Sequence, residues 1–189
     1  YYLGRMLLDQ GKLSEAEPLS REALEARREA WGSRVPHALA SMSSLGALLH
    51  TQGKLEEAAP LLREALQARR ETLGDKHPDT LLSINNLGSL LQAQGKLEEA
   101  EPLYREALQA RRETLGDKHP DTLQSLNNLG ALLKDQGKLE EAAPLMREAL
   151  QARRETLGDK HPNTLTALGN LAVLLEAQGK LAEAGPLYL

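Results

Sequence analysis

Residues 95–103 read GKLEEAEPL, and this block decides the fold because it recurs along the chain. Copies begin at Gly11 (GKLSEAEPL), Gly53, Gly137 and Gly179 (GKLAEAGPL), so the five copies are spaced 42 residues apart. A fixed period of this length is typical of a solenoid, in which each unit buries its apolar face only against its neighbours. The repeat therefore predicts a binding scaffold without identifying what is bound.

The composition narrows the core and the classes of partner. Hydrophobic residues make up 41% of the 189 residues, but aromatic residues only 3%, with no Phe, so we expect a core of Leu and Ala. The net charge of −4 is dispersed along the chain, which argues against nucleic acid and anionic membranes as partners. The absence of Cys excludes disulfides and thiolate metal sites and favours a reducing, cytoplasmic location.

The first half of a repeat predicts one helix, here called helix A. Apolar residues from Leu81 to Leu91 follow a helical stripe, after a proline that is well tolerated at the first helical position. Because the residue before proline avoids the α region, His77 is expected at the N-cap. Helix A should run from about Pro78 to Gln94 and end at Gly95 in a left-handed conformation.

The second half predicts an antiparallel helix B. Its apolar stripe comprises Leu97, Ala100, Leu103, Tyr104, Ala107, Leu108 and Leu115, and Gly116 should end it. Pro102 lies inside this helix, where it removes a backbone hydrogen bond and should cause a slight bend. A helix that starts only near Pro102 is less favoured because it would leave Leu97 and Ala100 outside the stripe.

The chain is thus predicted to be all-α: a single solenoid of antiparallel helix pairs without a linker. The units are 1–31 (partial), 32–73, 74–115, 116–157 and 158–189 (partial). The chain begins at Tyr1 without Met, inside an expected helix A, and ends at Leu189 inside an expected helix B. We therefore expect it to be a fragment.

These residues resemble a known family. The spacing of Ile84, Leu87-Gly88, Leu91, Gly95, Ala100, Tyr104 and Ala107 resembles the tetratricopeptide repeat (TPR). The longer unit, with NNLG, REAL and LGDKHP, resembles the 42-residue repeat of kinesin light chains. The resemblance covers essentially the whole chain. It implies a right-handed superhelix with helix A on the concave face, where the family binds extended peptides or partner proteins.

Differences between repeats point to the same face. Units 74–115 and 116–157 differ at seven positions, four of which lie on the helix A face opposite the stripe. These four are Leu82/Gln124, Ser89/Ala131, Gln92/Lys134 and Ala93/Asp135. Drift at solvated positions is the alternative explanation. The helix B residues interpreted as exposed argue against drift because they recur unchanged: Arg105, Glu106, Gln109, Arg111, Arg112 and Glu113.

The predicted peptide-binding residues share this helix A face and are mostly amides. They are Asn85, Asn86, Ser89, Gln92, Gln124, Asn127, Asn128, Lys134, Asp135 and Asn170. Asn is a poor mid-helix residue, and an amide that both donates and accepts can hold a peptide backbone. Asn86, Asn128 and Asn170 resemble the groove asparagine of peptide-clamping repeats. For Asn85 and Asn127 the alternative is a hydrogen bond to a neighbouring helix.

Charges on this face nearly cancel, because Asp9, Asp135 and Glu176 oppose Lys134. The first partial unit adds Tyr1, Tyr2 and Arg5 to the face. A polar, nearly neutral groove argues against a strongly acidic ligand.

Enzymatic and metal functions are not supported. His77, His119 and His161 recur once per repeat, too far apart to share a metal, and are interpreted as capping residues. No nucleophile–base pair, phosphate loop or cofactor motif is found, so we expect no enzyme. The second hypothesis is a structural or self-associating array: a spacer or sensor segment of a larger signalling protein, or an array made in the laboratory. End-to-end stacking or swapping would then cover the broken ends.

Overall fold

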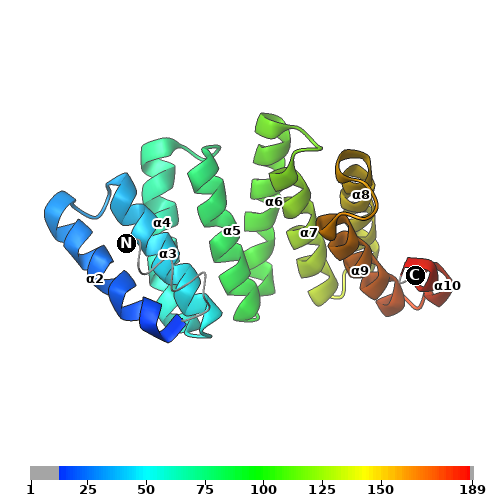
Figure 1. The fold of residues 1–189 in the computed structure, drawn as a ribbon, viewed down its shortest axis with the longest axis horizontal. Coiled ribbons are helices and arrows are strands. Elements are labelled where there is room, and N and C mark those ends of the chain that lie inside the picture. The colour runs from blue at the N-terminus through cyan, green and yellow to red at the C-terminus, as the bar shows by residue number, and fades with distance from the viewer. Residues whose placement is uncertain (1–12, 188–189) are drawn as a thin grey trace. The chain divides into compact units, whose positions relative to one another are not determined.

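The computed structural model describes residues 13–187, which contain helices and connecting turns but no strand (Figure 1). The all-α prediction is therefore confirmed for this part of the chain. The predicted groove residues Tyr1, Tyr2, Arg5 and Asp9 lie outside the described residues, as do both predicted broken ends.

The helices fall into two compact units, Tyr1–Gly95 and Lys96–Leu189. Their bounds follow, first unit and then second: α2 (Leu13–Trp31), α3 (Pro36–Thr51), α4 (Leu55–Leu73) and α5 (Pro78–Ala93); α6 (Leu97–Leu115), α7 (Pro120–Asp135), α8 (Leu139–Leu157), α9 (Pro162–Ala177) and α10 (Leu181–Ala184), before a 3-10 turn at Gly185–Leu187. Helices α3, α5, α7 and α9 are the A helices; α2, α4, α6, α8 and α10 are the B helices. Within each unit every helix packs on the next, and α3 also contacts α5 as α7 contacts α9.

The predicted helix boundaries are confirmed. His77 is the N-cap of α5 with extended backbone, and its Nδ1 accepts a hydrogen bond of 3.1 Å from the Asp79 N–H. His119 and His161 cap α7 and α9 in the same way, so these histidines act as capping residues. Gly95 and Gly116 have φ of +73° and +88°, a region that favours glycine.

Pro102 lies inside α6, which already begins at Leu97. The alternative of a helix that starts near Pro102 is therefore wrong. Pro18, Pro60 and Pro144 lie inside their B helices in the same way. The bend expected at these prolines stays a prediction.

The core consists mainly of Leu and Ala, as the composition predicts. Glycine allows close helix contact at one position of three A helices, whereas α9 carries the buried Ala172 there. A Cβ on Gly46 would lie 2.6 Å from Leu62 Cδ2, and one on Gly130 would lie 2.9 Å from Met146 Cγ. One part of the predicted helix B stripe is wrong: Leu115, the last residue of α6, is 40% exposed.

The prediction that Arg111 is exposed is also wrong, because only 7% of its surface is accessible. Its guanidinium donates to Ser125 Oγ at 2.7 Å and to the Asp121 carbonyl at 3.1 Å, both at the start of α7. Burial lowers the pKa of this guanidinium, but an arginine remains protonated in proteins. A charge that stays buried must keep its acceptors.

Arg69 shows the same arrangement in the first unit and adds a third helix. It donates from α4 to Ser43 of α3 at 3.0 Å and to Ser83 of α5 at 2.6 Å. One guanidinium therefore joins a B helix to the A helix of its own repeat and to the next A helix. In the last repeat Ala167 replaces the serine, and Arg153 donates to the carbonyl oxygens of Asn163 and Leu123 at 3.3 and 3.5 Å.

We expect Ser125→Ala to lower the free energy of unfolding by about 1–3 kcal/mol, because it removes an acceptor from a buried charge. Ala167→Ser should raise it by up to about 1 kcal/mol by giving Arg153 an acceptor. Urea denaturation measures both changes. Ser44→Ala, at an exposed position of α3, is the control and should stay within about 0.5 kcal/mol. Equal effects of Ser125→Ala and Ser44→Ala would show that the hydrogen bond from Arg111 to Ser125 does not stabilise the fold.

Candidate ligand-binding face on the A helices

The first unit presents the predicted residues of α5 on a partly exposed surface. Asn85, Asn86, Ser89 and Gln92 are all half-buried, and Leu82 on the same helix is exposed. Because α3 contacts α5, the equivalent residues of α3 belong to the same surface of this unit. We call the partly exposed side of each A helix the A face.

The second unit forms its A face from α7 and α9, which contact each other. Gln124 Nε2 donates to Asn128 Oδ1 at 2.7 Å, one helical turn apart, so these two predicted residues lie side by side. Lys134 Nζ lies 3.8 Å from Asp135 Oδ1. Asn170 on α9 is half-buried, like Asn128 on α7.

The two asparagines of each NNLG motif have different surroundings. Ser43 occupies the position of Asn85 and Asn127 in the second repeat and accepts a hydrogen bond from the buried Arg69. In the second repeat, the position of the first asparagine therefore faces the buried guanidinium of Arg69. Among the described residues, Asn127 Oδ1 is a buried oxygen without a hydrogen-bond partner. Both positions are half-buried, but at the following position Asn128 accepts a hydrogen bond from the exposed Gln124.

The A face can recognise polar groups more readily than charge. Its amides offer donors and acceptors together, the combination that a peptide backbone requires. The ion pair between Lys134 and Asp135 compensates the lysine charge locally. Val173 on α9 is exposed and adds an apolar contact to the second unit.

Sequence reasoning missed a cavity on the B-helix side of the first unit. It has a volume of about 490 Å³ and lies between α2 and α4 over Leu45 of α3. Leu24, Pro60 and Leu61 form apolar walls. The pair Arg21–Glu57, with an N–O distance of 2.5 Å, borders the opening. The sequence offered no signal for it, because Leu24, Pro60 and Leu61 stand at positions with the same residue types in the other repeats.

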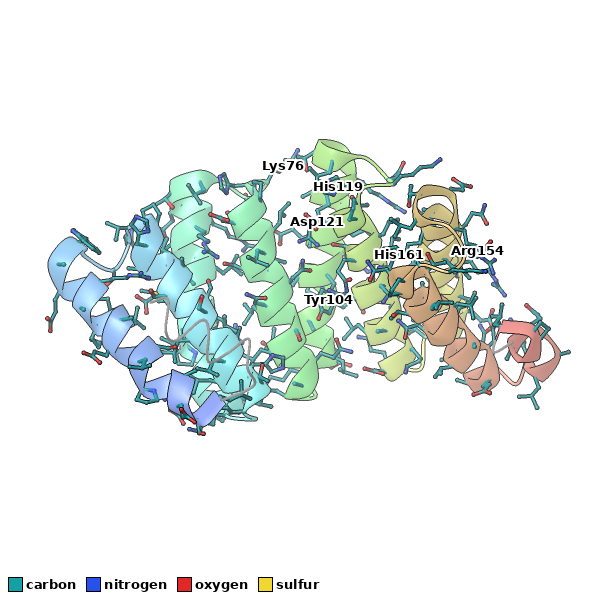
Figure 2. All side chains as sticks on the ribbon, viewed as in Figure 1. Lys76, Tyr104, His119, Asp121, Arg154 and His161 are labelled. Carbon is teal, nitrogen blue, oxygen red and sulfur yellow. The ribbon has the colours of Figure 1, made fainter. Side chains whose placement is uncertain are left out.

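The cap histidines can be followed in Figure 2, where His119 and Asp121 mark the start of α7 and His161 the start of α9. In residues 13–187 no group of three or more His, Cys, Asp or Glu side chains is placed to hold a metal ion. No helix among these residues is long and apolar enough to cross a membrane.

These features define an all-helical repeat protein built from antiparallel helix pairs. Sequence models of the tetratricopeptide repeat match residues 2–36, 38–79, 79–155 and 126–188, and the chain belongs to this family. The resemblance to the tetratricopeptide repeat that the sequence indicated is thereby confirmed. A search of curated proteins gives no match.

Among solved structures, the chain is similar to kinesin light chain-like repeat arrays. A kinesin light chain-like protein of Podosopora anserina with nearly identical TPR-like repeats is 28% identical, with a TM-score of 0.87 over 99% of this chain and 89% of that chain. BtubC (BKLC) from P. vanneervenii is 26% identical, with a TM-score of 0.84 over 98% and 74%. MamA from Desulfovibrio magneticus RS-1, at 16% identity and a TM-score of 0.68 over 99% and 88%, shares the fold alone. The α-solenoid class is confirmed.

Asn127→Ala tests whether the first asparagine of the motif is structural. We expect the free energy of unfolding to stay unchanged or to rise by about 0.5 kcal/mol, because alanine is the better helix former and a buried unpaired oxygen is removed. Asn128→Ala is the matched control, measured in urea beside it. A loss of more than about 1 kcal/mol for Asn127→Ala would show that its amide bonds to a neighbouring helix.

Proposed function

We propose that this chain is a non-enzymatic protein-interaction module whose A face binds an extended peptide segment of a partner protein. TPR repeats generally mediate protein–protein interaction or scaffolding, and such families are typically not enzymes. By the family resemblance, the A face is the concave side. The observation that carries the proposal is the half-exposed asparagine at one equivalent position of α5, α7 and α9, namely Asn86, Asn128 and Asn170.

Mid-helix asparagine is unfavourable because its side chain competes for backbone hydrogen bonds, so its recurrence on a partly exposed face favours a binding role. In the second unit Gln124 already donates to Asn128 Oδ1. The Asn128 amide N–H groups therefore remain as donors, and a carbonyl oxygen of an extended peptide is a suitable acceptor. Asn170, on the neighbouring α9, offers a second amide to the same peptide.

The recurrence of identical residues on the B helices is not evidence against drift on the A face. Arg105 donates to Glu141 of α8 at 3.2 Å, and Gln109 donates to Glu113 at 2.6 Å. Arg112 reaches Glu148 at 2.5 Å, and Arg111 is buried. Hydrogen bonding within and between repeats therefore explains why these residues recur, and drift remains the alternative on the A face.

The ligand that fits the A face best is polar and nearly neutral. Lys134 is compensated by Asp135, and Glu176 lies further along the face on α9. A strongly acidic peptide would meet little net positive charge there. We keep the cytoplasm as the proposed location, because a chain without Cys suits a reducing compartment.

Peptides that bind the chain can be selected from a random library by phage display. We expect their binding to be weakened by each of three substitutions, Asn86→Ala, Asn128→Ala and Asn170→Ala. The expected loss is about 2- to 10-fold per residue, the value of one hydrogen bond. Fluorescence anisotropy measures binding, and the melting temperature should stay nearly constant. Gln109→Ala, on α6, is the control. A parallel fall of affinity and melting temperature would show that the asparagines are structural.

A further inference from the structure

The residue before the proline in each B helix alternates along the chain. It is Glu17, Ala59, Glu101 and Ala143 in the first four repeats. We call this the pre-proline position. The following repeat contributes a Gln-Gly-Lys turn, which begins at Gln52, Gln94, Gln136 and Gln178.

Where the pre-proline residue is Glu, it receives the lysine of that turn. Lys54 Nζ lies 2.6 Å from Glu17 Oε2, and Arg21 Nε donates to Glu17 Oε1 at 3.0 Å. Arg21 also reaches Glu57 of α4 at 2.5 Å. The carboxylate is therefore the centre of a four-charge network that joins α2 to the next helix pair.

The second unit repeats this network around Glu101. Lys138 Nζ lies 2.7 Å away, Arg105 Nε donates at 2.8 Å, and Arg105 also reaches Glu141 of α8 at 3.2 Å. Only 17% of the Glu101 side chain is exposed, and 14% in the case of Glu17. The hydrogen bond from Lys138, followed by that from Arg105, lowers the pKa of Glu101 to about 2.

Where the pre-proline residue is Ala, the turn binds a different carboxylate. Gln94 Nε2 donates to Glu56 at 2.9 Å. Gln178 donates to Glu140 at 2.9 Å, and Lys180 Nζ lies 3.5 Å from the same carboxylate, whose side chain is 80% exposed. Solvent screens such a pair, and exposed ion pairs contribute little to stability. The fourth repeat therefore holds the fifth by weaker electrostatic contacts than those by which the third holds the fourth.

We propose that the pre-proline residue sets the stiffness of each contact between neighbouring repeats, with Glu locking the contact and Ala leaving it compliant. In the second unit this makes α6–α8 a locked pair of repeats and leaves the turn before α10 as the compliant point. Local opening concentrates where few buried contacts resist it. Movement at this turn would adjust α9 relative to α7, and with it the second unit's A face, whatever ligand binds there.

Hydrogen exchange measured by mass spectrometry tests the two turns against each other. The Lys138 N–H bonds the Leu133 carbonyl, and the Lys180 N–H bonds the Leu175 carbonyl, both at 2.8 Å, so equivalent amides report on both turns. Glu101→Gln should accelerate exchange at 136–142 by about tenfold, the effect of one pKa unit of lost interaction.

Ala143→Glu provides the opposite change at a position that is 2% exposed and equivalent to Glu101. It should give Lys180 a sheltered carboxylate and slow exchange at 178–184 by a similar factor. Glu113→Gln, which removes a carboxylate from α6 outside the network, is the matched control and should leave both turns unchanged. Urea denaturation of each variant separates local opening from a uniform loss of stability.

Acidification provides an independent readout at Glu101. Because its pKa is lowered in the folded chain, its contribution to stability is complete above about pH 4.5 and is lost as the pH falls toward 2. The difference in stability between the wild-type chain and Glu101→Gln should therefore shrink over this range. A difference that stays constant, or an Ala143→Glu chain whose 178–184 segment exchanges no more slowly, would overturn the proposal.

Discussion

The structure depends most on a guanidinium buried between three helices. Arg69 cannot lose its charge, and water does not reach it freely, so it must keep the oxygen atoms of Ser43 and Ser83 within reach. Those two serines belong to successive A helices. The packing of Leu and Ala fixes the helix contacts by shape, and a buried charge with fixed acceptors adds a directional requirement. Arg69 therefore fixes the register in which α4 contacts α3 and α5.

The two sides of the array differ in how many contacts between repeats their exposed residues make. On the B helices, arginine and glutamate residues 36 positions apart form pairs such as Arg28–Glu64 and Arg112–Glu148, so even exposed residues there have neighbours to satisfy. On the A face, the pairs formed within α7, Gln124 with Asn128 and Lys134 with Asp135, require no partner from another repeat. Changes at Gln124, Asn128 and Lys134 therefore need not disturb contacts between repeats.

The sequence was sufficient wherever the cause is local. Histidine before proline makes an N-cap because the backbone there must be extended, and Gly95 ends a helix because few other residues adopt its φ. It failed at Arg111, because an alternation of charge along a helix is the same pattern whether the side chain meets water or the serine of a neighbouring helix. It also failed at Leu115, where the apolar stripe continues past the point at which α6 still has a neighbour to bury it. For the candidate site, the sequence selected the helix face but did not separate Asn127, whose Oδ1 is buried without a hydrogen-bond partner, from Asn128, which pairs with Gln124.

The 42-residue period by itself determined the fold class, the helix boundaries and the family resemblance, because these follow from backbone preferences and from stripes that only a neighbouring copy can cover. The tertiary structure alone decided which charged residues are buried and which carboxylate each turn binds. The same Gln-Gly-Lys turn reaches Glu101 in one repeat and Glu140 in another. That choice depends on a residue 37 or more positions away in the chain, and only the packing of consecutive helix pairs brings the two together.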